Sequence, residues 1–197
     1  MPAAPRSPRK LSPDLIVAEA LAMAEGEGVG AVTLRPLAAR LGVSATALYR
    51  HVDSRGALLG LMLERRLADD YRDVPADRSW DDALRWYADN MWRVYGAVPG
   101  LAAETLAGRV TVARTQESAA RMIGVLADGG FGDDAPAVAF CFVHWGLSFL
   151  AALEHRPAEG EGYAEVPGHA APDPRAVYAD GVELHIAGLQ ARLAARG

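Results

Sequence analysis

The chain has 197 residues, of which 51% are hydrophobic and 23% are charged, so it is long enough and apolar enough to bury a core. A single cysteine, Cys141, excludes an internal disulfide framework and a thiolate cluster for zinc. The net charge of −5 is divided unevenly, because residues 1–66 carry +3 and residues 67–197 carry −8. A contact with phosphate groups is therefore expected in the basic N-terminal part.

Helical patterns follow one another along the chain, and no segment shows the alternation of apolar and polar residues that is typical of β-strands. The basic, proline-rich residues 1–10 lack the apolar core of a signal peptide, so we expect a flexible arm there. Residues 156–173, rich in Pro, Gly and Glu, are expected to form a mobile loop. The sequence predicts an all-α fold with helices at 13–25, 34–40, 45–51, 55–72, 80–96, 101–107, 110–127, 135–154 and 174–195.

The second and third of these helices have the pattern of a helix-turn-helix. Gly42 lies between them and can adopt a positive φ, and Ser44 can cap the third helix. Both helices carry one apolar face, made of Leu34, Leu37, Ala38, Leu41, Ala47, Leu48 and Val52. In this motif the later helix enters the major groove of DNA, so its outward side chains are candidates for contacts with phosphates and bases. A compact bundle with a solvated basic face is the alternative.

The stretch "TLRPLAARLGVSATALYRHVDSRGALL" (33–59) resembles the DNA-binding domain of the tetracycline-repressor (TetR) family, and with the residues before it the resemblance covers about 11–66. It implies an N-terminal three-helix DNA-binding domain. It places one group of side chains on phosphates: Thr33, Tyr49, His51 and Arg55. It places a second group against bases: Arg35, Ala45, Thr46 and Arg50. Arg55 stands where the family usually has lysine.

The remainder, 67–197, resembles the tetracycline-repressor branch through "SWDDALRWYADNM", "GLSFLAALE" and "YADGVELHIAGLQARL". The resemblance implies a helical domain that binds an effector and forms a homodimer through the helices near 135–154 and 174–195. The stretch 135–153 has no formal charge and approaches the length of a membrane span. Its flanks are acidic and lack basic anchors, so we favour a helix held between its own core and a sister subunit over a membrane segment.

An effector cavity in this domain is expected to be apolar with a few polar groups. Its candidate lining comes from the aromatic and polar residues of these helices: Trp86, Tyr87, Asn90, Met91, Tyr95, Thr105, His144, Trp145, Phe149 and Glu154. For the aromatic residues and for His144, an ordinary place in the core is the alternative. Thr105 aligns with the metal-binding histidine of the branch, so we expect a small apolar or aromatic effector bound without a metal or other cofactor.

Enzyme motifs are missing from the sequence, since it contains no GxSxG, HExxH, Walker or GxGxxG pattern. We therefore predict no enzyme but a cytoplasmic bacterial regulator, nucleoid-associated when bound to DNA. It is expected to be a repressor that a ligand releases from a palindromic operator of double-stranded DNA. An activator of the same family and a ligand-independent DNA-binding protein are the alternatives. The sequence does not define the operator, the regulated gene or the effector.

Overall fold

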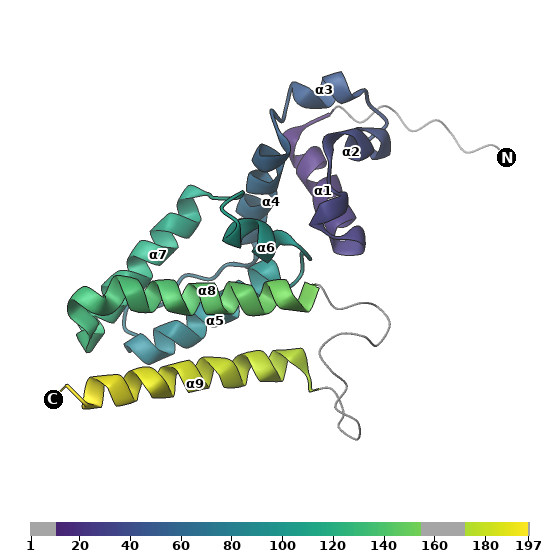
Figure 1. Ribbon diagram of the computed structural model, residues 1–197. Coiled ribbons are helices and arrows are strands. Elements are labelled where there is room, and N and C mark those ends of the chain that lie inside the picture. The colour runs from purple at the N-terminus through teal and green to yellow at the C-terminus, as the bar shows by residue number, and fades with distance from the viewer. Residues whose placement is uncertain (1–10, 155–171, 197) are drawn as a thin grey trace.

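The computed structural model describes residues 11–154 and 172–196, and every regular element in these residues is helical (Figure 1). The arm at 1–10 and nearly all of the loop at 156–173 lie outside the described residues. The all-α fold is confirmed. The elements are α1 (Pro13–Glu27), η1 (Val29–Ala31), α2 (Leu34–Arg40), α3 (Ala45–Tyr49), α4 (Arg55–Asp70), α5 (Trp80–Tyr95), α6 (Leu101–Leu106), α7 (Ala113–Leu126), η2 (Ala127–Phe131), η3 (Gly132–Asp134), α8 (Ala135–Glu154) and α9 (Pro174–Ala194).

The first helices form a small bundle at one end of the molecule (Figure 1). Helix α1 begins at a serine cap, where the Oγ of Ser12 accepts a hydrogen bond from the amide of Leu15. Its buried side chains, among them Ile16 and Ala20, meet buried residues of α2 and α4 in one hydrophobic core. The bundle therefore holds α2 and α3 with their outer faces in solvent.

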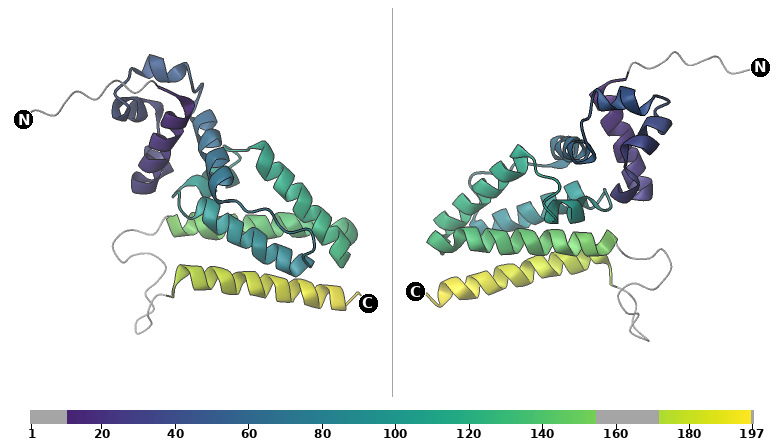
Figure 2. Two further views of the ribbon diagram at one scale, coloured as in Figure 1. Left: turned by 180° about the vertical axis from the view of Figure 1, so that it is seen from behind. Right: turned by 45° about the horizontal axis from the view of Figure 1, so that its top comes forward.

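Helix α4 joins this bundle to the rest of the chain, as two further views show (Figure 2). One of its faces is apolar, and the fully buried residues Leu58, Leu59, Met62 and Leu63 run along it. The first part of the helix packs against α1 and the later part packs against α5. A displacement of α4 would consequently move both parts of the molecule.

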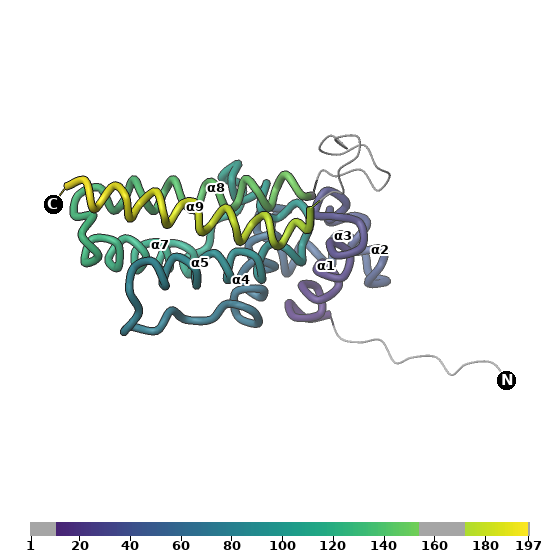
Figure 3. Tube along the Cα trace, turned by 90° about the horizontal axis from the view of Figure 1, so that it is seen from below, coloured from purple at the N-terminus to yellow at the C-terminus, as the bar shows by residue number. Residues whose placement is uncertain are grey.

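Helices α8 and α9 run antiparallel and side by side, which is clearest from below (Figure 3). The ring of Trp145 on α8 stacks on Tyr178 of α9, and the hydroxyl of Tyr178 donates to the carbonyl of Ala88 on α5. Arg85 on α5 binds both carboxylate oxygens of Glu183 on α9, at 2.8 and 2.9 Å. These contacts fix α8 and α9 onto α5.

The outer face of α8 is apolar and exposed. Phe140 is 62% exposed, and Cys141, His144 and Ser148 follow it along the same uncharged surface. A window within Ala113–Leu153 is long and apolar enough to cross a membrane by length and composition, and 33% of it is buried inside the chain. Core helices of soluble proteins meet the same criterion, so the finding alone does not indicate a membrane segment.

Candidate nucleic-acid interface and internal cavity

The turn between α2 and α3 has the geometry of a helix-turn-helix. Gly42 adopts a φ of +68°, which an L side chain rarely adopts, and this conformation ends α2. The amide of Val43 donates a hydrogen bond of 3.0 Å to the carbonyl of Ala38. The Oγ of Ser44 accepts a hydrogen bond from the amide of Ala47, so α3 begins at a capped first turn.

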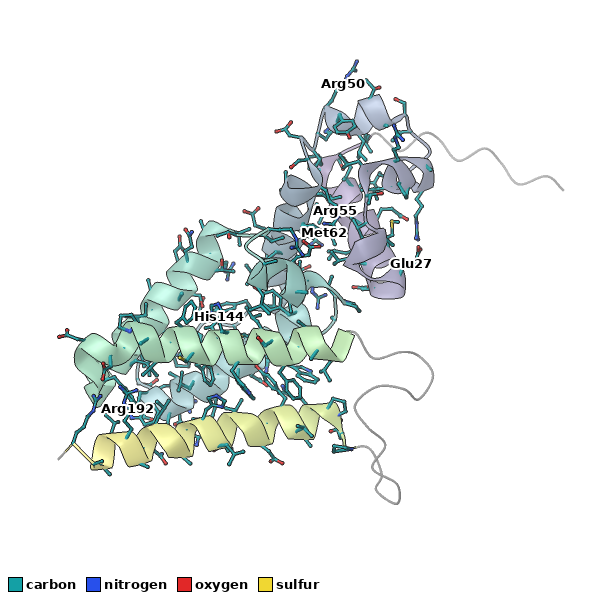
Figure 4. All side chains as sticks on the ribbon, in the orientation of Figure 1. Glu27, Arg50, Arg55, Met62, His144 and Arg192 are labelled. Atoms are coloured by element: carbon teal, nitrogen blue, oxygen red, sulfur yellow. The ribbon has the colours of Figure 1, made fainter. Side chains whose placement is uncertain are left out.

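The short helix α3 has one buried and one exposed side. Leu48 is completely buried and anchors the helix on the bundle, whereas its neighbour Tyr49 is 51% exposed. Thr46, Arg50 and His51 are exposed as well, while Ala45 at the start of the helix is half-buried. Figure 4 shows Arg50 pointing away from the molecule at this end. The side chains named for DNA contact on α3 and directly after it are thus exposed, apart from the half-buried Ala45.

Two further candidates lie at the start of α2, where Thr33 and Arg35 are exposed. Thr33 has the extended backbone of a cap, but its side chain makes no capping hydrogen bond. Among the described residues neither Arg35 nor Arg50 has a carboxylate within ion-pair distance, whereas Arg40 on α2 pairs with Glu19 and Glu27 of α1. Arg35 and Arg50 therefore keep their charge available for an anionic partner.

Arg55 differs from the expectation that it contacts a phosphate. Its side chain is half-buried and lies where the N-terminal bundle meets α6 (Figure 4). Its nitrogens donate to the carbonyl oxygens of Val32 and Val29 at 3.0 and 2.9 Å, and to the carboxylate of Glu104 at 3.1 Å. With these three acceptors occupied, Arg55 is a poor candidate for the phosphate contact and joins two parts of the chain instead.

A small cavity of about 90 Å³ lies within the C-terminal helices. It is lined by residues from the end of α4 and from α5, α7 and α8. Four of the residues predicted from the sequence line it: Tyr87, Asn90, Met91 and Tyr95. Sequence reasoning missed the other lining residues, which are Leu67, Tyr71, Val94, Thr115, Ser118, Ala119, Met122, Val143 and Leu147. The helical pattern of α7 marks Met122 as apolar, but no signal in the sequence shows that α7 faces α5.

Several predicted lining residues have other positions. Trp86 is on α5, but it lines an outer groove and donates its indole N–H to the carbonyl of Arg72. Trp145 and Phe149 pack on Tyr178 between α8 and α9. Each of these side chains leaves α5 or α8 on a face that does not meet the cavity, so their assignment to its lining is not supported by the geometry.

Three of the polar residues predicted for the lining are not found in the described cavity wall. Thr105 on α6 donates to the carbonyl of Leu101 and is absent from the cavity wall. His144 is exposed on the outer face of α8, where its ring stacks on Phe140. Glu154 is the last residue of α8, and its side chain lies outside the described residues.

The polar groups of the cavity wall are neutral and nearly all hydrogen-bonded. The hydroxyls of Tyr71 and Ser118 lie 2.8 Å apart, and the amide of Asn90 bonds both the N–H and the carbonyl of Arg72. The buried hydroxyl of Tyr87 makes no hydrogen bond to a described residue. Burial raises the pKa of Tyr87 to about 12, so this hydroxyl is neutral at ordinary pH.

Charged groups are absent from the described wall of the cavity, where no Asp, Glu, Lys, Arg or His is found. Across the described residues, no group of three or more His, Cys, Asp or Glu side chains lies close enough to hold a metal ion. A neutral, mostly apolar wall with one unpaired hydroxyl suits an uncharged molecule that carries a hydrogen-bonding group.

Comparison with known proteins agrees with this geometry. Residues 16–62 match the family model of "Bacterial regulatory proteins, tetR family". The match spans α1, α2, α3 and the first half of α4, and it confirms the resemblance found in the sequence.

Two relatives match the chain in part. The HTH-type transcriptional repressor DrrR1 of Streptomyces coeruleorubidus is 36% identical over 93 residues, which cover 46% of this chain and 34% of that protein. The tetracycline repressor protein class A from transposon 1721 of Escherichia coli is 40% identical over 77 residues, which cover 38% of this chain and 36% of that protein. The matched part spans about a third of the length of each relative.

A solved structure matches almost the whole fold. TetR-Q116A from Acinetobacter baumannii AYE in complex with minocycline superposes with a TM-score of 0.73 at 24% identity, covering 93% of this chain and 99% of that chain. At this identity the likeness establishes the all-helical architecture, including the C-terminal helices.

Proposed function

We propose that this chain, whose residues 16–62 match the family model of "Bacterial regulatory proteins, tetR family", is a repressor of transcription. In this proposal a homodimer in the cytoplasm binds a palindromic operator. A small neutral molecule in the C-terminal cavity then releases it. Residues 11–66 are the DNA-binding domain, and residues 67–197 bind the effector and form the dimer.

The exposed surface of α3 is the observation that carries the DNA-binding proposal. Leu48 fixes α3 to the bundle and leaves Thr46, Tyr49 and Arg50 exposed, and Arg35 is exposed at the start of α2. Hydroxyls and free guanidinium groups bind phosphate oxygens, and an arginine can also read a guanine in the major groove. Residues 67–197 carry a net charge of −8, which disfavours contact with DNA, so we place the contact here.

The homodimer is supported by the outer face of α8. Large exposed apolar patches on soluble proteins mark interaction sites, and Phe140 and its uncharged neighbours form such a patch on a helix already held by its own core. A second copy of α8 and α9 would cover it with a matching surface. Two-fold symmetry would present two copies of α3 to successive major grooves, about 34–36 Å apart.

The effector is inferred from the cavity wall. An uncharged, partly aromatic molecule would leave no charge unpaired, and its polar group would satisfy the Tyr87 hydroxyl. The cavity of about 90 Å³ is smaller than the roughly 300–1,000 Å³ that ligand sites of drug-sized molecules occupy. Binding therefore requires α5, α7 and α8 to separate, and this separation can carry the signal to α4.

The size of the cavity also favours a second candidate function. A protein whose cavity does not widen would bind DNA whether or not a small molecule is present, as a ligand-independent regulator. An activator would differ only in where its operator lies relative to the promoter. Both alternatives keep the DNA contact at α3.

Selection from a pool of random DNA duplexes with the full chain tests the proposal. We expect the selected duplexes to share an inverted repeat, because a symmetric dimer reads two identical half-sites. Selection without any shared motif would exclude sequence-specific DNA binding. Selection of a single, unrepeated motif would exclude the dimeric arrangement.

A further inference from the structure

We infer that Arg55 and Glu104 form an ionic joint that fixes the DNA-binding bundle on the body and thereby sets the separation of the two recognition helices. This inference rests on the proposed function for its effect on DNA. The joint itself is a feature of the single chain.

Arg55 occupies a position from which it holds three segments together. It is the first residue of α4, and its guanidinium donates to the carbonyl oxygens of Val29, the first residue of η1, and Val32, the residue after η1. The same guanidinium binds the carboxylate of Glu104 on α6. A planar guanidinium presents several donors in a fixed fork, so it can satisfy these acceptors together, as a lysine could not.

Glu104 is fixed from its other side. Its second carboxylate oxygen accepts a hydrogen bond from Arg109, and its side chain is only 13% exposed. The hydrogen bonds from Arg109 and Arg55 hold the pKa of Glu104 below its ordinary value, so the carboxylate is charged at neutral pH. Partial burial weakens screening by salt, and the ion pair is therefore more than a solvated surface contact.

Backbone contacts beside the joint also hold the N-terminal bundle close to the segment before α6. The amide of Val29 donates to the carbonyl of Pro99 at 2.7 Å, across the boundary between η1 and the segment before α6. Gly100 adopts a φ of +94°, and a Cβ there would lie 3.0 Å from the Cβ of Val29. Any other residue at Gly100 would be strained by this φ and crowded against Val29.

The other side of α6 leads to the cavity. Tyr95 lines the cavity, and its hydroxyl lies near the side chain of Thr105, the residue after Glu104. Helix α6 also packs on α8, which forms another part of the cavity wall. A change in the cavity that displaces α6 would act directly on the Arg55–Glu104 pair.

Amide hydrogen exchange of Val29 in the DNA-free protein tests the joint. We compare the parent with Arg55→Met and Glu104→Gln, and with Arg40→Met as a matched control that breaks an ion pair inside the bundle. The amide of Val29 should exchange at least about fivefold faster in both joint variants, because fivefold is the lower end of typical coupling between sites. In the control variant it should exchange at the same rate as in the parent. Unchanged protection in both joint variants overturns the inference.

A set of duplexes tests the consequence for DNA. Each contains the selected inverted repeat with its half-sites moved apart or together by one or two base pairs. The parent should bind one spacing more tightly than the others. In Arg55→Met and Glu104→Gln the ratio of affinities for the preferred and the other spacings should fall about fivefold or more, while Arg40→Met should keep the ratio of the parent. The dependence of binding on salt should not change in Arg55→Met, because no phosphate contact is lost.

A different result would show that Arg55 contacts a DNA phosphate. In that case Arg55→Met lowers the salt slope by about one unit and Glu104→Gln keeps the spacing preference, which overturns the inference. If the parent selects no DNA, the proposed function fails, while the exchange of Val29 still decides whether the joint exists. The two failures are therefore distinguishable.

Discussion

The indole of Trp145 stacks on the ring of Tyr178, with centroids 5.3 Å apart and ring planes 13° from parallel. This contact joins α8 to α9, and Tyr178 in turn bonds to α5. The two helices consequently form one rigid unit behind the exposed face that we assign to the dimer. The stack also explains why Trp145 is unavailable to the cavity.

Two glycines on α9 test this packing. At Gly181 a Cβ would lie 2.3 Å from the Trp145 ring, whereas at Gly188 nothing lies within 4 Å. Gly181→Ala should lower the free energy of unfolding by about 1–3 kcal/mol, because the clash forces the stack apart. Gly188→Ala should leave it unchanged or raise it by up to about 1 kcal/mol through better helix propensity. Urea unfolding measures both, and equal effects of the two substitutions would contradict the packing.

The face of α8 is tested at Phe140. Phe140→Glu places a charge in the proposed interface, where a desolvated, unpaired carboxylate is costly, so the protein should become monomeric. Gln116→Glu adds a charge to an exposed position of α7 and should leave the dimer intact. Sedimentation at micromolar concentration distinguishes the two. A parent protein that already sediments as a monomer removes the basis for a symmetric operator.

The unpaired hydroxyl in the cavity gives a prediction about stability and binding together. Tyr87→Phe removes a buried group without a partner and should leave unfolding free energy unchanged or raise it by about 1 kcal/mol. Tyr71→Phe breaks the hydrogen bond to Ser118 and should lower it by a similar amount. Neutral aromatic compounds with a hydrogen-bonding group should bind the parent more tightly than Tyr87→Phe in calorimetric titration. Stability loss in Tyr87→Phe would show that its hydroxyl is already satisfied.

Tyr95 gives a prediction about alkaline pH. Burial raises its pKa to about 12, above the ordinary value of 10, so the folded state favours the neutral phenol. This contribution to stability is complete below pH 10 and is lost as the pH rises from 10 through 12. Between pH 7 and pH 11 the parent should lose about 1.4 kcal/mol more unfolding free energy than Tyr95→Phe. Parallel losses in the two proteins, measured by urea unfolding, would show that Tyr95 is not shielded.

The helices and the helix-turn-helix were predictable because their signals are local. Gly42 and Ser44 set the turn and the cap, and apolar spacing separates the buried Leu48 from the exposed Tyr49. The observed ends of the helices differ from the predicted ones by only a few residues; the third helix, expected at 45–51, ends at Tyr49.

The cavity was less predictable because its wall comes from four helices that are distant in sequence. Periodicity shows that α5 has an apolar face, but not that Ser118 of α7 lies opposite Tyr71. Aromatic content drew attention to Trp86 and Trp145, whose partners lie elsewhere. For Arg55, the family pattern suggested a phosphate, and only the fold shows the carbonyl groups and Glu104 around it.

Binding of the parent and of Arg50→Ala to the selected inverted repeat, measured by fluorescence anisotropy at fixed salt, tests the central claim most directly. We predict that two chains bind each duplex. The affinity for a scrambled duplex should be lower by a factor of about a thousand or more. Arg50→Ala should cost roughly 1–3 kcal/mol, while Arg40→Ala, whose guanidinium faces Glu19 and Glu27, should bind like the parent. Equal affinity of the parent for the repeat and the scrambled duplex would contradict the account.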